Sequence, residues 1–475
     1  MQHSKDVNVM FGRSTSRFAF ALVVPLLAGL QMIAFAPAVQ AQNFDEALAL
    51  AYQNNPSLQA TRASLRAADE EVPEAKSGWR PTVSSSLSVG YLDADFENNT
   101  TGAESSGSSY PKEFSLTISQ PIYRGGRTEA AIRKAEHDVQ SSRATMFIAE
   151  QTALLNAATV YMDVLRDEFV LKLRINNVKR LEKQLEATED RFGVGEVTRT
   201  DVAQAASRVA RANADRTQAE GILISSRVVF ERVVGIVPEK LSLPGTPLGL
   251  PSSRDEAVEI AVQNNFALVR SKFAEQSSIE DIDLLSGRLL PTVNFTSTAS
   301  KDYDTSGGDN ESSSVSLSFV VSVPIYQAGA LSARIRQSKE VANQARINVE
   351  ISRRNAVDQA ARNYENWRTG LARIVSLKAE VESARIALDG VEQEATVGAR
   401  TVLDVLDAEQ ELLTAQVSLV GAERNALLSA YQLLSALGRM TATNLELPVQ
   451  AYDYDEHYRQ VRDAYWGPAT IGKQP

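Results

Sequence analysis

Two aspartates in the last quarter of the sequence, Asp404 and Asp407, lie three residues apart within a helical pattern. Residues at this spacing share one face of a helix, so both carboxylates would point the same way. Around the axis of a symmetric oligomer, they would form a ring of negative charge. Such a ring attracts cations, repels anions and binds divalent ions that can plug a pore. The pair therefore predicts an ion-binding aperture.

The motif that contains Asp404 occurs twice. Val194-Gly195-x-x-Thr198-x-x-Asp201-Val202 recurs as Val397-Gly398-x-x-Thr401-x-x-Asp404-Val405. A threonine followed three residues later by a carboxylate is typical of a helix N-cap, and the carboxylate also suits the helix dipole. The preceding glycines permit a tight reversal of the chain; they are Gly193, Gly195 and Gly398.

Capping alone would account for Asp201 and Asp404, but it does not account for Asp407. The counterpart of Asp407 in the first occurrence is Gln204, so this charge is specific to the second occurrence. The difference favours a role for Asp407 beyond helix capping.

Catalytic and metal-binding patterns find no support in the sequence. There is no cysteine, which excludes disulfides, thiol catalysis and thiolate metal sites. His3, His137 and His457 stand apart, without metal-ligand or catalytic spacing, and the last two are most simply solvated surface residues. Gly193-x-Gly195 lacks the strand-then-helix context of a nucleotide-binding loop. We expect no enzyme activity, no metal and no cofactor.

Residues 1–41 have the features of a secretory signal peptide. A basic start precedes an apolar stretch from Phe18 to Leu30, and small residues up to Ala41 suit cleavage. Pro25 and Gln31 interrupt the apolar stretch, which disfavours a membrane-spanning helix. The whole chain carries a net charge of −10, and the leader has three basic residues and one acidic residue, so the mature chain is near −12. This balance argues against a nucleic-acid partner.

The elements that must position the aspartates belong to a module that is used twice. Asp45-Glu46-Ala47 and Pro81-Thr82-Val83 recur 210 residues later as Asp255-Glu256-Ala257 and Pro291-Thr292-Val293. Pro121-Ile122-Tyr123 recurs as Pro324-Ile325-Tyr326, only 203 residues later. The Val-Gly-x-x-Thr-x-x-Asp-Val motif, called the tip motif below, keeps that offset. A single loss of seven residues in the second copy explains the change.

Each copy begins with a helix, about 44–79 or 254–288, the first broken near Pro56. Two strand patterns follow, with apolar and polar residues alternating as expected for strands with one apolar face. The segments between the strands, 93–110 and 302–314, are rich in Ser, Gly, Asn and Asp, which predicts exposed loops. The apolar positions are Val83, Leu87, Val89, Tyr91, Phe114, Leu116 and Ile118, then Val293, Phe295, Val315, Leu317, Phe319, Val321 and Val323.

Long helical patterns complete each copy. The segments 126–191 and 330–396 would each span roughly 100 Å as helices, and return helices are expected at 198–234 and 401–437. In the last one, apolar residues recur every seven positions, which predicts supercoiling against a neighbouring helix. They are Leu406, Leu413, Val420, Leu427 and Leu434, with Val405, Leu412, Leu419, Ala426 and Leu433 beside them.

Four strands of roughly ten residues have the length to cross a bilayer when tilted. Two soluble hairpins covering a helical core are the alternative. Four strands cannot close a membrane barrel, and an open edge in lipid would leave backbone groups unpaired. Strands that span must therefore come from several chains, and two, three or four copies would give 8, 12 or 16 strands.

The order of these motifs resembles the TolC family, from Phe44 to about Leu447, and the segment from Val397 to Ala408 is especially close. The resemblance implies an α+β membrane protein: a homotrimer with a 12-stranded β-barrel in the outer membrane, continuous with a helical barrel in the periplasm. It implies a passive exit duct for a tripartite drug-efflux or type I protein secretion system. The implied partners are a periplasmic adaptor and an inner-membrane ABC or RND transporter.

The resemblance also assigns residues. Asp404 and Asp407 match the aspartates that line the periplasmic entrance, Arg400 matches the gate arginine, and Thr200 and Asp201 match its partners on the outer helix pair. One position departs from the family pattern, because Ala395 stands where well-studied members have a second gate link through tyrosine. We therefore expect a gate held mainly by Arg400. The alternative for Arg400 is a surface arginine paired with Asp404.

The expected domains are the signal peptide 1–41, a first repeat 42–250, a second repeat 251–447 and a tail 448–475. The tail carries several tyrosines among acidic residues, and both packing on the helices and a flexible end are compatible with it. The rival hypothesis is a periplasmic coiled-coil adaptor or scaffold that does not span the membrane; a general porin is disfavoured by the long helices.

Overall fold

The computed structural model describes residues 43–98, 100–305, 310–465 and 467. The expected signal peptide, residues 1–41, lies outside the described residues. No helix among the described residues is both long enough and apolar enough to cross a membrane.

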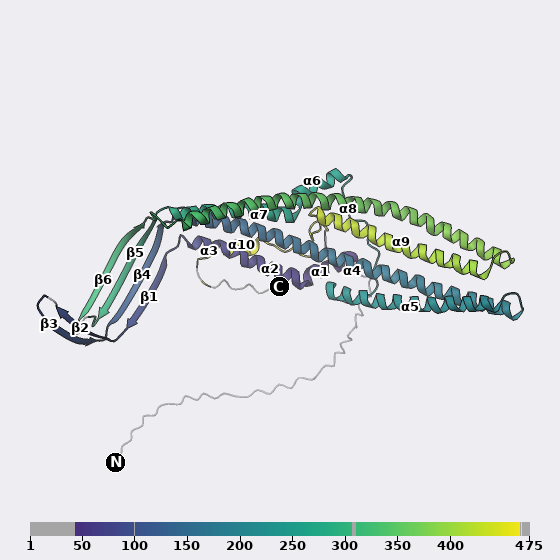
Figure 1. Cartoon of the computed structure of the whole chain (residues 1–475), viewed down its shortest axis with the longest axis horizontal. Coiled ribbons are helices and arrows are strands. Elements are labelled where there is room, and N and C mark those ends of the chain that lie inside the picture. Colours follow the sequence, from purple (N-terminus) through teal and green to yellow (C-terminus); the bar gives the residue numbers. More distant parts are fainter. Residues whose placement is uncertain (1–42, 99, 306–309, 466, 468–475) are drawn as a thin grey trace, which may run out of the picture. The chain divides into compact units, whose positions relative to one another are not determined.

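Both copies of the module run from short helices through strands to two long helices, and the first copy has an additional hairpin (Figure 1). The first copy has α1 (Phe44–Asn54), α2 (Pro56–Asp69), α3 (Glu71–Ser77), β1 (Thr82–Val89), β2 (Leu92–Asn98), β3 (Ala103–Ser109), β4 (Lys112–Tyr123), α4 (Arg127–Gly193) and α5 (Arg199–Val234). The second has α6 (Arg254–Asn264), α7 (Phe266–Ser286), the 3-10 turn η1 (Gly287–Leu289), β5 (Thr292–Tyr303), β6 (Glu311–Ser322), α8 (Ala330–Thr396) and α9 (Val402–Ala436). A short helix, α10 (Glu456–Val461), follows.

The short helices before each strand pair are interrupted at matching asparagines. The Asn55 side chain accepts hydrogen bonds from the backbone N–H groups of Ser57 and Leu58 and caps α2, whose first residue is Pro56. Asn265 caps α7 in the same way, so the uninterrupted helix expected over 254–288 is wrong. Both asparagines have extended backbone, and such a cap stabilises a new helix start even without a proline.

The four longest strands form one antiparallel sheet in the order β1-β4-β5-β6. Its register aligns Ser85, Leu116, Ala299 and Val315 across the sheet. Because side chains alternate between faces, the apolar positions predicted from the sequence lie on one face and the serines and threonines largely on the other. The predicted separation of the two faces is confirmed.

The connections between the strands differ from one copy to the other. Residues 93–110 were expected to be an exposed loop, but β2 and β3 pair over most of this segment as a second hairpin, from Leu92↔Ser109 to Asn98↔Ala103. In the second copy, β5 and β6 stay in register to their ends at Tyr303 and Glu311. The extra length of the first copy therefore extends a hairpin, where insertions are tolerated.

The long helices pack side by side along their lengths, α4 with α5 and α8 with α9 (Figure 1). Both seven-residue columns predicted on α9 are largely buried: Leu406, Leu413 and Leu434 in one, Val405, Leu412 and Leu433 in the other. Where the helix pairs approach α1, the core is formed around Tyr161 and Phe44, whose rings meet edge to face at 5.1 Å.

The described part of the C-terminal segment packs on the first copy. His457 Nδ1 lies 3.0 Å from Oδ2 of the fully buried Asp69, and Arg143 pairs with Asp455 at 2.5 Å. Lys76 pairs with Asp463 at 2.6 Å. Of the two alternatives for the tail, packing is thus correct as far as Tyr465. The expectation that His457 is solvated is wrong, because its side chain is only 25% exposed.

Candidate functional site

The two turns that join the long helices have the same geometry. Gly195 and Gly398 adopt positive φ angles of 81° and 79°, which a residue with a Cβ rarely adopts. In the second turn, the Ala399 N–H donates to the Glu394 carbonyl at 2.9 Å, and in the first, the Glu196 N–H donates to the Arg191 carbonyl at 2.9 Å. These bonds satisfy carbonyls at the helix ends and reverse the chain.

Each return helix begins with the capping pair that the sequence predicts. The Thr401 N–H donates to Asp404 Oδ2 at 2.9 Å, and the Asp404 N–H donates to Thr401 Oγ1 at 3.2 Å. Thr198 and Asp201 form the equivalent pair, at 2.8 Å and 3.3 Å. These hydrogen bonds lower the pKa of both aspartates, first through the threonine N–H and then through its hydroxyl. Both carboxylates therefore stay ionised well below neutral pH.

Asp407 has a partner that sequence reasoning missed. Its Oδ1 accepts a hydrogen bond from Nη2 of Arg208, on the neighbouring return helix α5, at 2.6 Å. Arg208 lies on α5 more than one helical turn after the tip motif and is not part of it. The sequence motif therefore could not predict the pair, which depends on the packing of α5 beside α9. The charge of Asp407 is thus partly compensated within one chain, whereas no arginine or lysine lies within 4.0 Å of the Asp404 carboxylate among the described residues.

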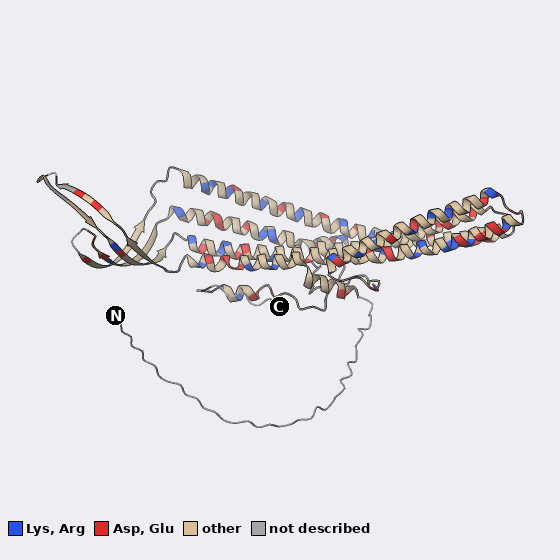
Figure 2. Ribbon diagram, turned by 90° about the horizontal axis from the view of Figure 1, so that it is seen from below, with Lys and Arg blue, Asp and Glu red and all other residues tan. Residues whose placement is uncertain are grey.

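Arg400 forms an ion pair with Glu394 at the end of α8, with Nε 2.8 Å from Oε2. This bond, more than the charge of Asp404, raises the pKa of Arg400. The structure of one chain does not bring Arg400 into contact with Thr200 or Asp201. It also does not form the alternative ion pair of Arg400 with Asp404. Figure 2 shows residues of both charges near the turns at the ends of the helices.

A buried carboxylic acid lies just above the turns. Glu409 on α9 is 3% exposed, and its Oε2 has no hydrogen-bond partner. It borders a cavity of about 600 Å³ between α4, α8 and α9, which Arg180, Lys183 and Glu392 also line. Burial raises the pKa of Glu409 to about 7, against the attraction of Arg180. Glu409 could not be singled out from the sequence, because a polar residue between the apolar positions of a heptad pattern is normally exposed.

The pairing of Asp407 gives a testable expectation. If Asp404 and Asp407 form the expected ring, replacing Arg208 with glutamine should free the Asp407 carboxylate and strengthen block by divalent cations about threefold, because an exposed ion pair compensates only part of a charge. Single-channel recording with Mg²⁺ titrated on the periplasmic side would measure this. Arg211→Gln, one turn further along α5, is the matched control and should leave the block unchanged. Weaker block in Arg208→Gln would contradict the expectation.

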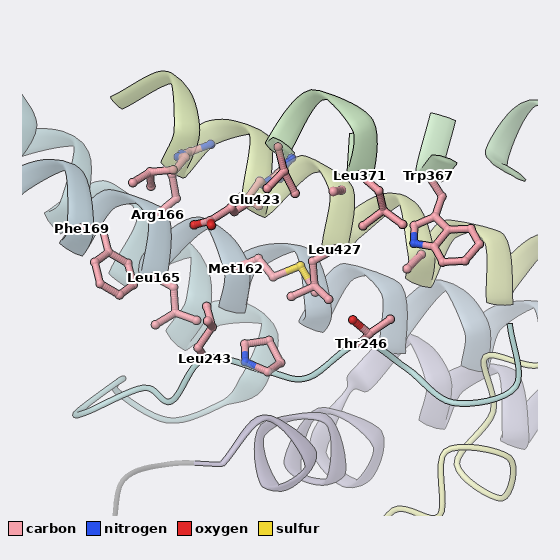
Figure 3. Close-up of a pocket in the computed structure, with 16 residues that line it drawn as sticks. Met162, Leu165, Arg166, Phe169, Leu243, Thr246, Trp367, Leu371, Glu423 and Leu427 are labelled. Atoms are coloured by element: carbon pink, nitrogen blue, oxygen red, sulfur yellow. The ribbon is translucent and has the colours of Figure 1, made fainter. Parts of the chain in front are cut away.

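Figure 3 shows a second cavity, of about 280 Å³, whose lining residues are distant in sequence from both turns. Its wall is mostly apolar and comes from α4, α8, α9 and the loop after α5. Arg166 and Glu423 are among the few charged residues that border it. The residues that surround it are Met162, Leu165, Arg166, Phe169, Leu243, Pro244, Thr246, Trp367, Leu371, Ile374, Val420, Glu423, Arg424, Ala426, Leu427 and Ala430.

Known proteins resemble this chain over most of its length. The Outer membrane efflux protein family matches residues 47–235 and 257–439, one match in each copy of the module. The outer membrane efflux protein BepC of Brucella suis biovar 1 (strain 1330) is 34% identical over 427 residues, which cover 89% of this chain and 91% of BepC. The outer membrane protein TolC of Escherichia coli (strain K12) is 28% identical over 449 residues, covering 89% and 87% of the two chains.

The fold agrees with these sequence matches. The outer membrane channel CmeC of Campylobacter jejuni superimposes with a TM-score of 0.75 at 15% sequence identity, over 88% of this chain and 89% of CmeC. The predicted fold class, the resemblance to the TolC family and the outer membrane location are confirmed. This chain belongs to the outer membrane efflux protein family.

Proposed function

We propose that three copies of this chain form one exit duct, in which the sheets close into a 12-stranded barrel in the outer membrane and the long helices line a periplasmic tunnel. The carrying observation is the four-stranded sheet. Its edges are β1 and β6, of 8 and 12 residues, and neither has a second partner strand among the described residues of one chain. Unpaired backbone groups are costly in lipid, and pairing β1 of one copy with β6 of the next removes every edge.

The exposed apolar face of the same sheet supports membrane insertion. Leu87, Val315 and Phe319 are 72%, 75% and 69% exposed in one chain. An apolar surface of this extent is unfavourable in water and favourable against acyl chains. A periplasmic adaptor or scaffold would have no use for such a face, so the rival hypothesis is not supported.

The duct needs partners to load it. The resemblance to the TolC family implies that a periplasmic adaptor and an inner-membrane transporter of the ABC or RND class deliver substrate to the turns, and a relative named for efflux supports an export role. In this proposal the chain conducts passively, and its described tip residues contribute ring electrostatics and a gate. The domain organisation that goes with this function is a signal peptide 1–41, repeats 42–250 and 251–447, and a tail 448–475.

The periplasmic gate lies at the turns. In the assembled duct, Asp404 and Asp407 form the aperture ring. Arg400 holds the inner helix pair, α8 and α9, against Thr200 and Asp201 of the outer pair, α4 and α5. The contact with these residues forms between copies or in the closed state, since Arg400 bonds Glu394 in the isolated chain. Gly195 and Gly398 reverse the chain at the tips with positive φ angles, and Gly193 is the last residue of α4.

An Arg400→Ala variant tests the gate. We expect its single-channel conductance in planar bilayers to rise about threefold, because the closed aperture loses its main link and Ala395 offers no second one. Arg385→Ala is the matched control. Arg385, on α8, has an exposed side chain (59%, against 50% for Arg400) and pairs with Glu382 at 2.7 Å, as Arg400 pairs with Glu394; its loss should leave conductance unchanged.

Two outcomes would count against the gate. Unchanged conductance in Arg400→Ala would reduce Arg400 to a surface residue that bonds Glu394. An equal rise in Arg385→Ala would show a general loosening of α8 instead of a specific link.

A further inference from the structure

Two glycines bring the sheet end of α4 into backbone contact with the end of α7. A Cβ on Gly125 would collide with the Gly287 carbonyl oxygen, and a Cβ on Gly287 would collide with the Gly125 carbonyl oxygen. Gly125 also has a φ angle of 66°, which favours glycine. Because the backbones meet at Gly125 and Gly287, the side chains that flank these two glycines lie close together.

Three arginines meet at this contact: Arg124 and Arg127 beside Gly125, and Arg288 beside Gly287. Arg124 Nη1 donates to the Gly78 carbonyl at 3.3 Å, and Arg127 Nε donates to the Arg124 carbonyl at 2.8 Å. None of the three has a carboxylate within 4.0 Å among the described residues. Partial burial, and then the charges of Arg124 and Arg288, lower the pKa of Arg127. The cluster is an uncompensated positive charge, in which backbone carbonyls hold Arg124 and Arg127 and Arg288 is exposed.

Carboxylates of α7 pair with another arginine of α4. Arg133, further along α4, lies 2.7 Å from Glu280 and 3.6 Å from Asp283. Glu129 also contributes to the raised pKa of Arg133. The acidic residues on this part of α4 and α7 therefore do not neutralise the three arginines.

The position of the cluster is the boundary between sheet and helices. β4 ends at Tyr123 and β5 begins at Thr292, one on each side of the glycine contact. Tyr123, Leu289 and Leu290 are each more than 40% exposed there. Aromatic and apolar side chains beside unpaired arginines are typical of the level of lipid headgroups. Since the helices extend into the periplasm, this boundary faces the periplasmic side of the outer membrane.

We propose that Arg124, Arg127 and Arg288 form a binding site for the phosphate of an anionic phospholipid headgroup at the periplasmic face of the outer membrane. Guanidinium groups bind phosphate oxygens through paired N–H donors. Basic clusters at the end of membrane-spanning segments recognise anionic headgroups in this way. The second copy cannot form the same site, because Gln327 and Ala330 replace Arg124 and Arg127. Each chain thus carries one site.

The test uses the purified full-length mature protein in detergent, titrated with phosphatidylglycerol, with phosphatidylcholine or with inorganic phosphate, and read by native mass spectrometry. The native protein should prefer phosphatidylglycerol to phosphatidylcholine. A variant with glutamine at all three arginines should lose about fivefold of that preference, in line with the attraction of basic residues to anionic headgroups. Arg288→Gln alone should lose about twofold, and it should fold, because Arg288 is exposed and forms no side-chain hydrogen bond in the described structure.

A matched control carries the same loss of charge elsewhere. Arg353→Gln with Arg354→Gln and Arg362→Gln removes three arginines that pair with carboxylates of α8, and it should keep the preference. An equal loss in this control, or an unchanged preference in Arg288→Gln and the triple variant, would overturn the site. Displacement of phosphatidylglycerol by an equal concentration of inorganic phosphate would show a site for the free anion and overturn its assignment to lipid. These results do not depend on the gate, which is measured by conductance.

Discussion

An Asp404→Asn and Asp407→Asn double variant should lose block by divalent cations on the order of a hundredfold and conduct with clearly weaker cation selectivity. In a three-fold assembly the change removes every carboxylate of the proposed ring at once. Divalent ions bind such rings through several carboxylates together, so the affinity falls steeply when all are neutralised. Block by Mg²⁺ and the reversal potential in a salt gradient, both in planar bilayers, measure the two effects.

The capping geometry makes asparagine the right substitution. Asparagine keeps an oxygen that can accept the Thr401 N–H, so the start of α9 should be preserved while the charge is lost. Asp358→Asn with Asp389→Asn, on α8 at 38 and 7 residues before its end at Thr396, removes the same charge and should leave block nearly unchanged. Asp407→Asn alone should have a smaller effect than the double variant, since Arg208 already compensates this carboxylate. Full block in the double variant would refute the ring.

Much of this architecture could be predicted because the signal is local and repeated. The caps at Thr198 and Thr401 depend on neighbours three residues away, and both were predicted from the motif. The ends of α8 coincide with the expected segment 330–396. Gly329 precedes its first residue, and Gly398 and the cap Thr401 follow its last. The faces of the sheet followed from alternation, which no tertiary contact has to supply.

What could not be predicted depends on partners distant in sequence. Arg208 meets Asp407 across 199 residues, and only helix packing sets that distance. The pairing of Arg400 with Glu394 was missed because the turn, not the helix spacing, brings the two side chains together. The β2–β3 hairpin was read as a loop, since a segment rich in serine and glycine has a weak strand pattern.

Glu409 is the residue for which the structure changes the expectation most. It lies on α9, two residues after Asp407, and packing removes it from water without giving Oε2 a hydrogen bond. The charged groups that face it come from every neighbouring helix. They are Arg180, Lys183 and Arg191 of α4, Glu196 of the first turn, Arg208, Arg211 and Asp215 of α5, and Glu392 of α8. A carboxylate in this position is destabilising unless it binds a proton.

The pH dependence follows from the two pKa values. The ordinary pKa of a glutamate is 4.5, and that of folded Glu409 is about 7. The folded state therefore binds more protons than the unfolded state between these values, and stability falls as pH rises through that window. Below pH 4.5 the cost is absent, and above about pH 7 it is complete. A difference of about 2.5 in pKa corresponds to about 3 kcal/mol per chain.

Glu409→Gln should remove this cost and leave a neutral side chain of the same shape. We expect the local opening free energy of the first turns of α9, measured by hydrogen exchange, to rise by about 3 kcal/mol at pH 8 and to change little at pH 4.5. Glu411→Gln, an exposed glutamate on the same helix, loses the same charge and should show no pH-dependent gain. A gain of equal size at both pH values would mean that the substitution improves packing, and that ionisation of Glu409 does not weaken the tip.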